Sequence, residues 1–180
     1  MRVLIDTCVL FPTVMREVVL GVARAGLIEP IWSARILEEW ARAAIKLGPD
    51  GEAQARAEIA LLRRDWPDAE RPAAPGVAAR LWLPDTDDIH VLAVAVDASA
   101  DAIMTLNTKD FPRGTLADEG LDRMDPDGFV MAQWVDQPQV VAQVARDVLA
   151  NARKLSGQSW EMRALLKKAR LPRLAKALMG

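Results

Sequence analysis

The sequence has few of the residues on which several common enzyme chemistries depend. It holds one cysteine, Cys8, and one histidine, His90, in 180 residues. A single cysteine excludes an internal disulfide and fits a reducing cytosol, so we expect a cytoplasmic protein. A histidine-centred acid–base mechanism would rest on one residue in an otherwise apolar stretch. We therefore interpret His90 as a packing or helix-end residue and Cys8 as a buried thiol.

Long hydrophobic runs and phosphate-binding loops are absent as well. No apolar stretch approaches the roughly 18 residues that span a bilayer, and Asp6 falls where a signal peptide needs its apolar segment. There is no Gly-rich phosphate loop or dinucleotide fingerprint. A hydrophobic fraction of 51% nevertheless supplies a proper core. The length suits one domain with at most a small appendage.

Short β-rich runs alternate with helical patterns along most of the chain. The β-rich runs lie at residues 2–7, 30–32, 101–106 and 121–124, and residues 81–84 suit a short strand or an extended entry. Helical patterns cover residues 12–26, 34–47, 52–64, 87–98 and 128–135, with Ser33 and Thr86 as expected N-caps. Residues 65–76 hold three prolines and suit a loop. This alternation predicts an α/β fold with a mainly parallel sheet flanked by helices.

The C-terminal part differs from the rest in pattern and in charge. Only helical patterns follow residue 137, at 140–155 and at 161–179 with an interruption at Pro172, so we expect a domain at 1–135 and a helical extension at 136–180. Residues 1–150 carry 15 basic and 24 acidic residues, a net charge of −9. Residues 151–180 carry 8 basic residues and one acid, a net of +7. The basic segment suits either contact with a polyanion or a solvated helix face.

Carboxylates gather where a parallel sheet would place a ligand, beyond the carboxyl ends of its strands. Four segments supply them: Asp6 after the first strand, Glu38 and Glu39 in a helix, Asp85, Asp87 and Asp88 at a helix start, and Asp110 after the strand at 101–106. Carboxylates without other ligand types describe a site for a hard cation, Mg²⁺ or Mn²⁺. Such a cation also removes the repulsion between carboxylates that lie close together.

Each acid also has a structural explanation. Asp6 could simply end its strand, although a carboxylate directly after a buried strand is costly without a partner. Asp85 and Asp88 also suit a helix cap and its partner. Glu38 and Glu39 suit a solvated helix surface, and Asp110 suits the start of a turn. Three acids within four positions exceed what capping requires.

Four segments, in order, resemble the motifs of PIN domains, in which acidic residues bind metal. They are Ile5–Leu10, Trp32–Trp40, Leu83–Val96 and Ala100–Pro112. The resemblance covers about residues 1–135 and is greatest to the VapC-type toxins, in the subgroup with a helical C-terminal extension. It implies a Mg²⁺- or Mn²⁺-dependent endoribonuclease, a hydrolase that acts as the toxin of a type II toxin–antitoxin pair. It also implies a homodimer and a cognate antitoxin protein as partner.

The resemblance also assigns residues. Asp6, Glu39, Asp88 and Asp110 take the family's four catalytic, metal-binding positions, and Asp85 is a possible fifth, outer acid. Glu38 competes with Glu39, since neighbours on a helix point about 100° apart. Glu39 is preferred because it directly precedes Trp40, as the motif requires. Asn107 competes with Asp110, because many relatives carry Asp where this chain has Asn107.

RNA binding and the rival functions depend on other residues. The basic residues expected to contact RNA are Arg163, Lys167, Lys168 and Arg170, with Arg173 and Lys176 near them. The same residues suit contact with a protein partner. A flap-type DNA nuclease would be larger, and a phosphatase with a nucleophilic Asp6 would need a second Asp where Cys8 stands. The non-enzymatic alternative is a degenerate PIN scaffold that binds RNA or protein.

Overall fold

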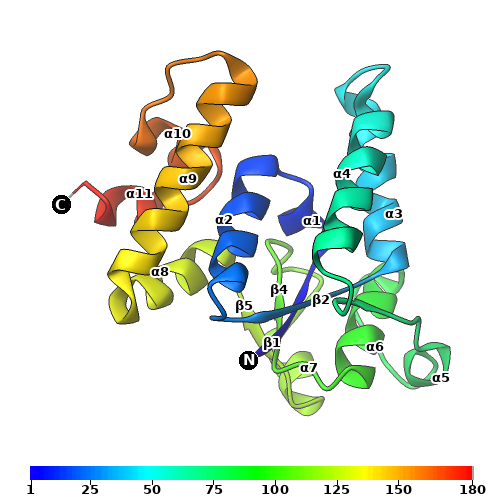
Figure 1. Cartoon of the computed structure of the whole chain (residues 1–180). Coiled ribbons are helices and arrows are strands. Elements are labelled where there is room, and N and C mark those ends of the chain that lie inside the picture. Colours follow the sequence, from blue (N-terminus) through cyan, green and yellow to red (C-terminus); the bar gives the residue numbers. More distant parts are fainter. Residues whose placement is uncertain (180) are drawn as a thin grey trace. The chain divides into compact units, whose positions relative to one another are not determined.

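A computed structural model describes residues 1–179 of the chain (Figure 1). The contacts divide them into two units. Unit 1 comprises Met1–Phe11 and Glu29–Arg123, and unit 2 comprises Pro12–Ile28 together with the chain from Met124 onward. One N-terminal helix therefore groups with the C-terminal helices. The expected domain boundary after residue 135 stays a prediction.

Unit 1 is built on a five-stranded sheet in the order β3-β2-β1-β4-β5. The strands are β1 (Arg2–Ile5), β2 (Glu29–Ser33), β3 (Glu70–Arg71), β4 (Ala102–Met104) and β5 (Asp122–Met124). β1 pairs in parallel with β2 and with β4, and β2 pairs in parallel with β3. The apolar residues of β1 and β4 are completely buried, as the uninterrupted hydrophobic runs predict. The carboxyl ends of β1, β2 and β4 therefore meet at one edge, and the expected α/β fold is confirmed.

The helices of unit 1 lie between these strands in the sequence. They are α1 (Thr7–Leu10), α3 (Ala34–Ala43), η1 (Ala44–Leu47), α4 (Gly51–Asp65), α5 (Pro75–Ala78), η2 (Thr86–Asp88), α6 (Ile89–Asp97) and α7 (Arg113–Asp118). Ser33 caps α3 as predicted, because its hydroxyl accepts a hydrogen bond from the Ile36 amide at 3.3 Å. Ile36, Leu37 and Trp40 form the buried stripe of α3. That stripe fixes which residues of α3 face away from the core.

Two local expectations are wrong, and one alternative is settled. Residues 81–84 form no strand, which leaves the extended entry as the other alternative. The loop expected at 65–76 contains a strand of two residues, β3. A two-residue strand between prolines is too short to show a period of two. Asp85, and not Thr86, caps the next helical turn, since its Oδ1 accepts from the Asp87 amide at 2.9 Å. The short helix α7 was not expected at all.

Unit 2 is a group of helices. It contains α2 (Thr13–Arg24), α8 (Pro126–Asp136), α9 (Pro138–Ser156), α10 (Met162–Lys168) and α11 (Pro172–Ala177). The buried carboxylate of Asp127 in α8 accepts from the backbone amides of Arg173 at 2.9 Å and Leu174 at 3.2 Å, so it caps α11. The leucines at 165, 166, 171 and 174 are buried. The predicted C-terminal helices are thus an integral part of this unit.

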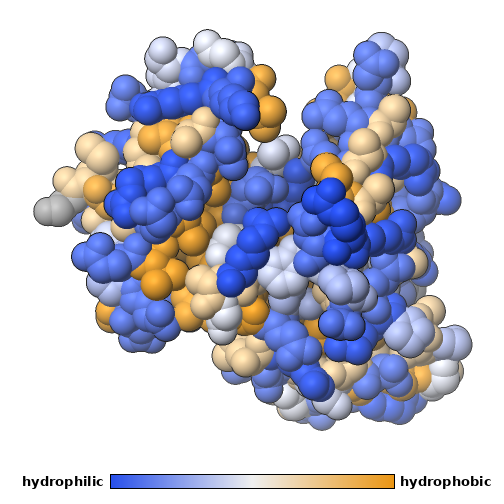
Figure 2. All heavy atoms as spheres, viewed as in Figure 1, coloured by the Kyte–Doolittle hydropathy of each residue, from blue (hydrophilic) through white to orange (hydrophobic). Residues whose placement is uncertain are grey.

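No helix within residues 1–179 is both long enough and apolar enough to cross a membrane. The surface in Figure 2 is mainly hydrophilic, with scattered apolar patches.

Candidate metal centre

Asp6 lies directly after β1 and is only 6% exposed. Its Oδ2 accepts a hydrogen bond from the Thr105 hydroxyl at 2.6 Å and from the Cys8 thiol at 3.0 Å. Thr105 follows β4, and its hydroxyl oxygen accepts a hydrogen bond from the backbone amide of Asn107 at 2.9 Å. The ends of β1 and β4 are thus joined through one carboxylate oxygen of Asp6.

The Cys8 thiol serves this arrangement as a hydrogen-bond donor. Burial, followed by the neighbouring charge of Asp6, raises the pKa of Cys8 to about 12. The side chain is therefore a neutral thiol at physiological pH. Cys8 is half-buried and not fully buried as expected, and its raised pKa leaves it without the properties of a nucleophile.

Three further carboxylates, those of Asp85, Asp88 and Asp110, lie close to one another. Asp85 directly precedes η2, Asp88 is the last residue of η2, and Asp110 comes from the loop after β4. One oxygen of each lies within 4.8 Å of the other two. The side chain of Asn107 joins two of these segments. Its Nδ2 donates to Asp88 Oδ2 at 3.1 Å, and its Oδ1 accepts from the backbone amide of Asp110 at 3.4 Å. Asn107 therefore lies beside the acids, and it connects them without adding charge.

The loop that carries Asp110 is held from β5. Arg123 Nη1 donates to the carbonyl oxygens of Thr108 at 2.8 Å and Phe111 at 2.7 Å. These two bonds bracket Asp110 in the sequence. They fix the backbone of this loop without engaging its carboxylate.

The negative charges of the other four acids act on Asp88. Its pKa is raised to about 6, first by burial and then by the charges of Asp6, Asp85, Asp110 and Glu39. The raised pKa thus reflects both the burial of the Asp88 carboxyl group and the negative charges around it. An oxygen-only donor set under such repulsion fits a hard divalent cation.

Glu39 belongs to this group, and three side chains hold its carboxylate. Arg35 Nε donates to Oε1 at 3.2 Å, and the Thr7 hydroxyl donates to Oε2 at 3.1 Å. His90 Nε2 lies 2.9 Å from Oε1, at ion-pair distance but outside hydrogen-bond geometry. Burial raises the pKa of Glu39, but the contacts with His90, Thr7 and Arg35 together lower it by more. The net pKa therefore lies below its usual value.

Glu38 has a different environment. Its carboxylate binds Arg56 of α4 at 2.9 Å and Arg42 at 3.0 Å, and these two arginines lower its pKa to about 2. The charge of Glu39, in contrast, helps to raise the pKa of Asp88. The structure therefore brings together Asp6, Glu39, Asp85, Asp88 and Asp110 and leaves Glu38 aside. Their roles as ligands stay a prediction.

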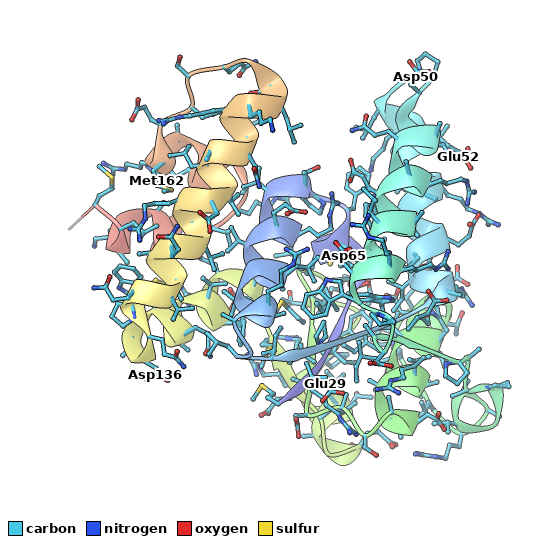
Figure 3. All side chains as sticks on the ribbon, in the orientation of Figure 1. Glu29, Asp50, Glu52, Asp65, Asp136 and Met162 are labelled. Atoms are coloured by element: carbon cyan, nitrogen blue, oxygen red, sulfur yellow. The ribbon has the colours of Figure 1, made fainter. Side chains whose placement is uncertain are left out.

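Several acids elsewhere in unit 1 form ion pairs with arginines. Figure 3 shows Glu52 near the outer end of α4, where it binds Arg56 at 2.6 Å. Glu29 begins β2, at the opposite end from the cluster, and contacts Arg2 at 3.4 Å and Arg71 at 3.6 Å. These ion pairs contrast with Asp85, Asp88 and Asp110, none of which forms a salt bridge within residues 1–179.

The basic residues expected to contact RNA all lie in unit 2. Arg163, Lys167 and Lys168 belong to α10, Arg170 follows it, and all four are exposed. Lys168 Nζ lies 4.8 Å from the centre of the Trp160 ring. Exposed cations suit either a polyanion or solvent, so RNA contact remains a prediction.

Sequence reasoning missed the residues that support the acids. Thr105 could have been noticed as a polar residue that continues an apolar strand, and it is completely buried. Arg35 could have been noticed one helical turn before Glu39. His90 was interpreted as a packing or helix-end residue, and it does lie at the start of α6, but it also contacts the Glu39 carboxylate. Nothing in the sequence identified Thr7, because its partner lies on another helix.

Comparison with known proteins gives one family match. The family model described as PIN domain matches residues 2–109, which is more than half of the chain. The matched span contains all five acids except Asp110, which follows its last residue. No curated protein and no solved structure matches.

Proposed function

The chain belongs to the PIN-domain family, and from this membership we propose that it is a metal-dependent endoribonuclease that hydrolyses RNA phosphodiester bonds. The observation that carries the proposal is the convergence of Asp85, Asp88 and Asp110, whose ligand atoms lie within 4.8 Å of one another. The negative charges of Asp6 and Glu39 also act on Asp88. This all-oxygen donor set favours Mg²⁺ or Mn²⁺ as cofactor.

In this proposal Asp6 and Asp88 are the principal ligands. Glu39 and Asp110 hold a second cation or orient the attacking water, and Asp85 is an outer acid. A bound divalent cation supplies Lewis acidity and lowers the pKa of bound water. Thr105 and Cys8 keep the Asp6 carboxylate in one orientation. Preorganisation of this kind is what electrostatic catalysis requires.

Substrate binding is a separate requirement. A cluster of carboxylates repels the RNA backbone unless positive charge on the protein offsets this repulsion. We assign part of that role to the exposed residues Arg163, Lys167, Lys168 and Arg170. Their support is exposure and a concentration of positive charge in the last 30 residues.

The test is cleavage of an RNA oligonucleotide by the purified chain in Mg²⁺ or Mn²⁺. We expect cleavage that excess EDTA abolishes and that Asp6→Asn reduces at least about a hundredfold, since the amide keeps the shape and removes the charge. Asp87→Asn is the matched control, because Asp87 is exposed and is not one of the three acids whose ligand atoms converge. Full cleavage in excess chelator contradicts the proposal. A folded protein without metal binding or cleavage favours the degenerate scaffold.

The finer proposal is that the chain is the VapC-type toxin of a toxin–antitoxin pair. The motif resemblance and the family match support it. Expression in a bacterium should arrest growth, Asp6→Asn should not, and a small protein from the adjacent reading frame should restore growth. Growth unaffected by an active ribonuclease would contradict the toxin role alone.

A homodimer is part of the same proposal. Three large apolar side chains of η1 and α4 are substantially exposed: Ile45 by 56%, Leu47 by 68% and Leu61 by 51%. Light scattering at micromolar concentration should give twice the mass of one chain. A monomer across that range contradicts the dimer.

A further inference from the structure

Arg35 lies at the edge of the carboxylate cluster and touches two of the segments that form it. Its Nε donates to Glu39 Oε1 at 3.2 Å, and its Nη2 donates to the carbonyl oxygen of Asp87 at 3.2 Å. Asp87 directly precedes Asp88. The guanidinium therefore spans from α3 to η2, at the residue before Asp88.

The guanidinium is only partly used by these contacts. The side chain of Arg35 is 55% exposed, and its Nη1 has no hydrogen-bond partner within residues 1–179. In the same part of the chain no other arginine or lysine contacts any of the five clustered acids. Within residues 1–179, Arg35 is thus the one arginine or lysine that contacts the clustered carboxylates.

An ion pair between residues i and i+4 of a helix needs no functional explanation by itself. Helix α3 offers an internal comparison, since Arg42 and Glu38 form a second pair of the same spacing at 3.0 Å. Arg42 reaches only Glu38 of its own helix, and Arg56 neutralises the same carboxylate. Arg35 differs because it also bonds to a segment 52 positions away. That second bond holds the guanidinium at the cluster.

We infer that Arg35 binds a backbone phosphate of the RNA at the entrance of the site, beside the phosphate that is cleaved. The inference rests on the proposed ribonuclease function. A guanidinium keeps its charge at every physiological pH and presents paired N–H donors that match phosphate oxygens. Its exposed edge is free to make this contact while Nε and Nη2 keep their bonds. Arg35 is therefore a substrate-binding residue and not a metal ligand.

The experiment compares Arg35→Gln, Arg35→Lys and the matched control Arg42→Gln. RNA affinity is measured by fluorescence anisotropy against salt concentration, with each change made in the Asp6→Asn protein in Mn²⁺ so that the RNA stays intact. Arg35→Gln should weaken binding about tenfold and lower the salt slope by about 0.7, the value for one phosphate contact on a single strand. Arg35→Lys should keep the slope, and Arg42→Gln should change neither quantity.

Two further readouts separate binding from support of Glu39. With Asp6 intact, Arg35→Gln should raise KM about tenfold and change kcat little. The rise in melting temperature on adding Mn²⁺ should equal that of the unaltered protein. An unchanged salt slope in Arg35→Gln, or a lost Mn²⁺ response, overturns the inference and leaves Arg35 as a partner of Glu39. If the unaltered chain neither binds nor cleaves RNA, the ribonuclease function fails and this inference with it.

Discussion

Thr105 donates a hydrogen bond of 2.6 Å to Asp6, across the ends of two neighbouring parallel strands. Both residues are buried, Thr105 completely and Asp6 to all but 6%. The Thr105 oxygen also accepts from the Asn107 amide, so one hydroxyl connects the Asp6 carboxylate to the loop that carries Asp110. The position of the cluster therefore depends on a residue without charge.

Thr105→Val tests this dependence. The change keeps the side-chain shape but leaves the backbone amide of Asn107 without its partner and leaves Asp6 Oδ2 with the weaker Cys8 thiol as donor. We expect a loss of about 1–3 kcal/mol in the free energy of unfolding, measured with urea in EDTA. Thr105→Ser keeps the hydroxyl and should retain the Asp6 bond, with a smaller loss from the missing methyl group. Equal losses in the two variants would show that the hydroxyl has no special role.

Asp88→Asn should have opposite effects with and without metal. The pKa of Asp88 is raised to about 6, so the stability that its protonation confers is present below about pH 4 and is lost as pH rises through 6. Asparagine abolishes that loss and still accepts from Asn107. In EDTA at pH 7 the variant should therefore be more stable, by on the order of 1–2 kcal/mol after allowance for solvent screening.

In Mn²⁺ the order should reverse, because the variant has lost a charged ligand. Melting curves at pH 5 and pH 7, with and without Mn²⁺, measure both effects. Asp87→Asn serves again as control and should follow the unaltered protein. A variant that keeps the full Mn²⁺ response would remove Asp88 from the ligand set.

Glu39→Gln and Glu38→Gln form a pair of adjacent, chemically identical changes. Glu39 is held by Thr7, Arg35 and His90 beside Asp88, whereas Glu38 is neutralised by Arg42 and Arg56. RNA cleavage should fall on the order of a hundredfold in Glu39→Gln, as when one electrostatic stabiliser is removed from an active site. Glu38→Gln should cleave RNA normally. The reverse order of activities would place Glu38 in the site.

Hydrophobic runs made the strand ends readable from the sequence, whereas the choice of acids on the helices came from the resemblance to PIN domains. Asp6 follows Val3, Leu4 and Ile5, and its position after β1 is confirmed. The choice between Glu38 and Glu39 was less accessible. It depends on Arg56, which reaches Glu38 from α4, and no local pattern encodes a contact between two helices.

Other features could not be predicted for related reasons. Strand β3 has two residues, and its place beside β2 comes from pairing and not from periodicity. Asp85 and Thr86 are both good N-cap residues, and only the course of the loop selects Asp85. The grouping of α2 with the C-terminal helices depends on contacts between distant parts of the sequence.

Those contacts give a final prediction, at Gly21 of α2. A Cβ atom at this position would lie 2.5 Å from Val144 Cγ1 of α9, so the two helices approach closely through the missing side chain. Alanine normally stabilises a helix by about 1 kcal/mol relative to glycine. Overpacking typically costs about 1–3 kcal/mol, and valine cannot easily turn aside, because its rotamer is restricted in a helix. We expect the clash to win, with Gly21→Ala destabilised by up to about 2 kcal/mol in urea unfolding.

Two controls make the packing argument specific. A Cβ atom at Gly114 in α7 would meet nothing within 4 Å, so Gly114→Ala should be neutral or stabilising. Adding Val144→Ala to Gly21→Ala removes the clashing methyl groups, and the double variant should be more stable than the sum of the single changes predicts. A coupling energy near zero would mean that α2 and α9 can separate slightly at no cost. The close approach at Gly21 would then be incidental to the stability of unit 2.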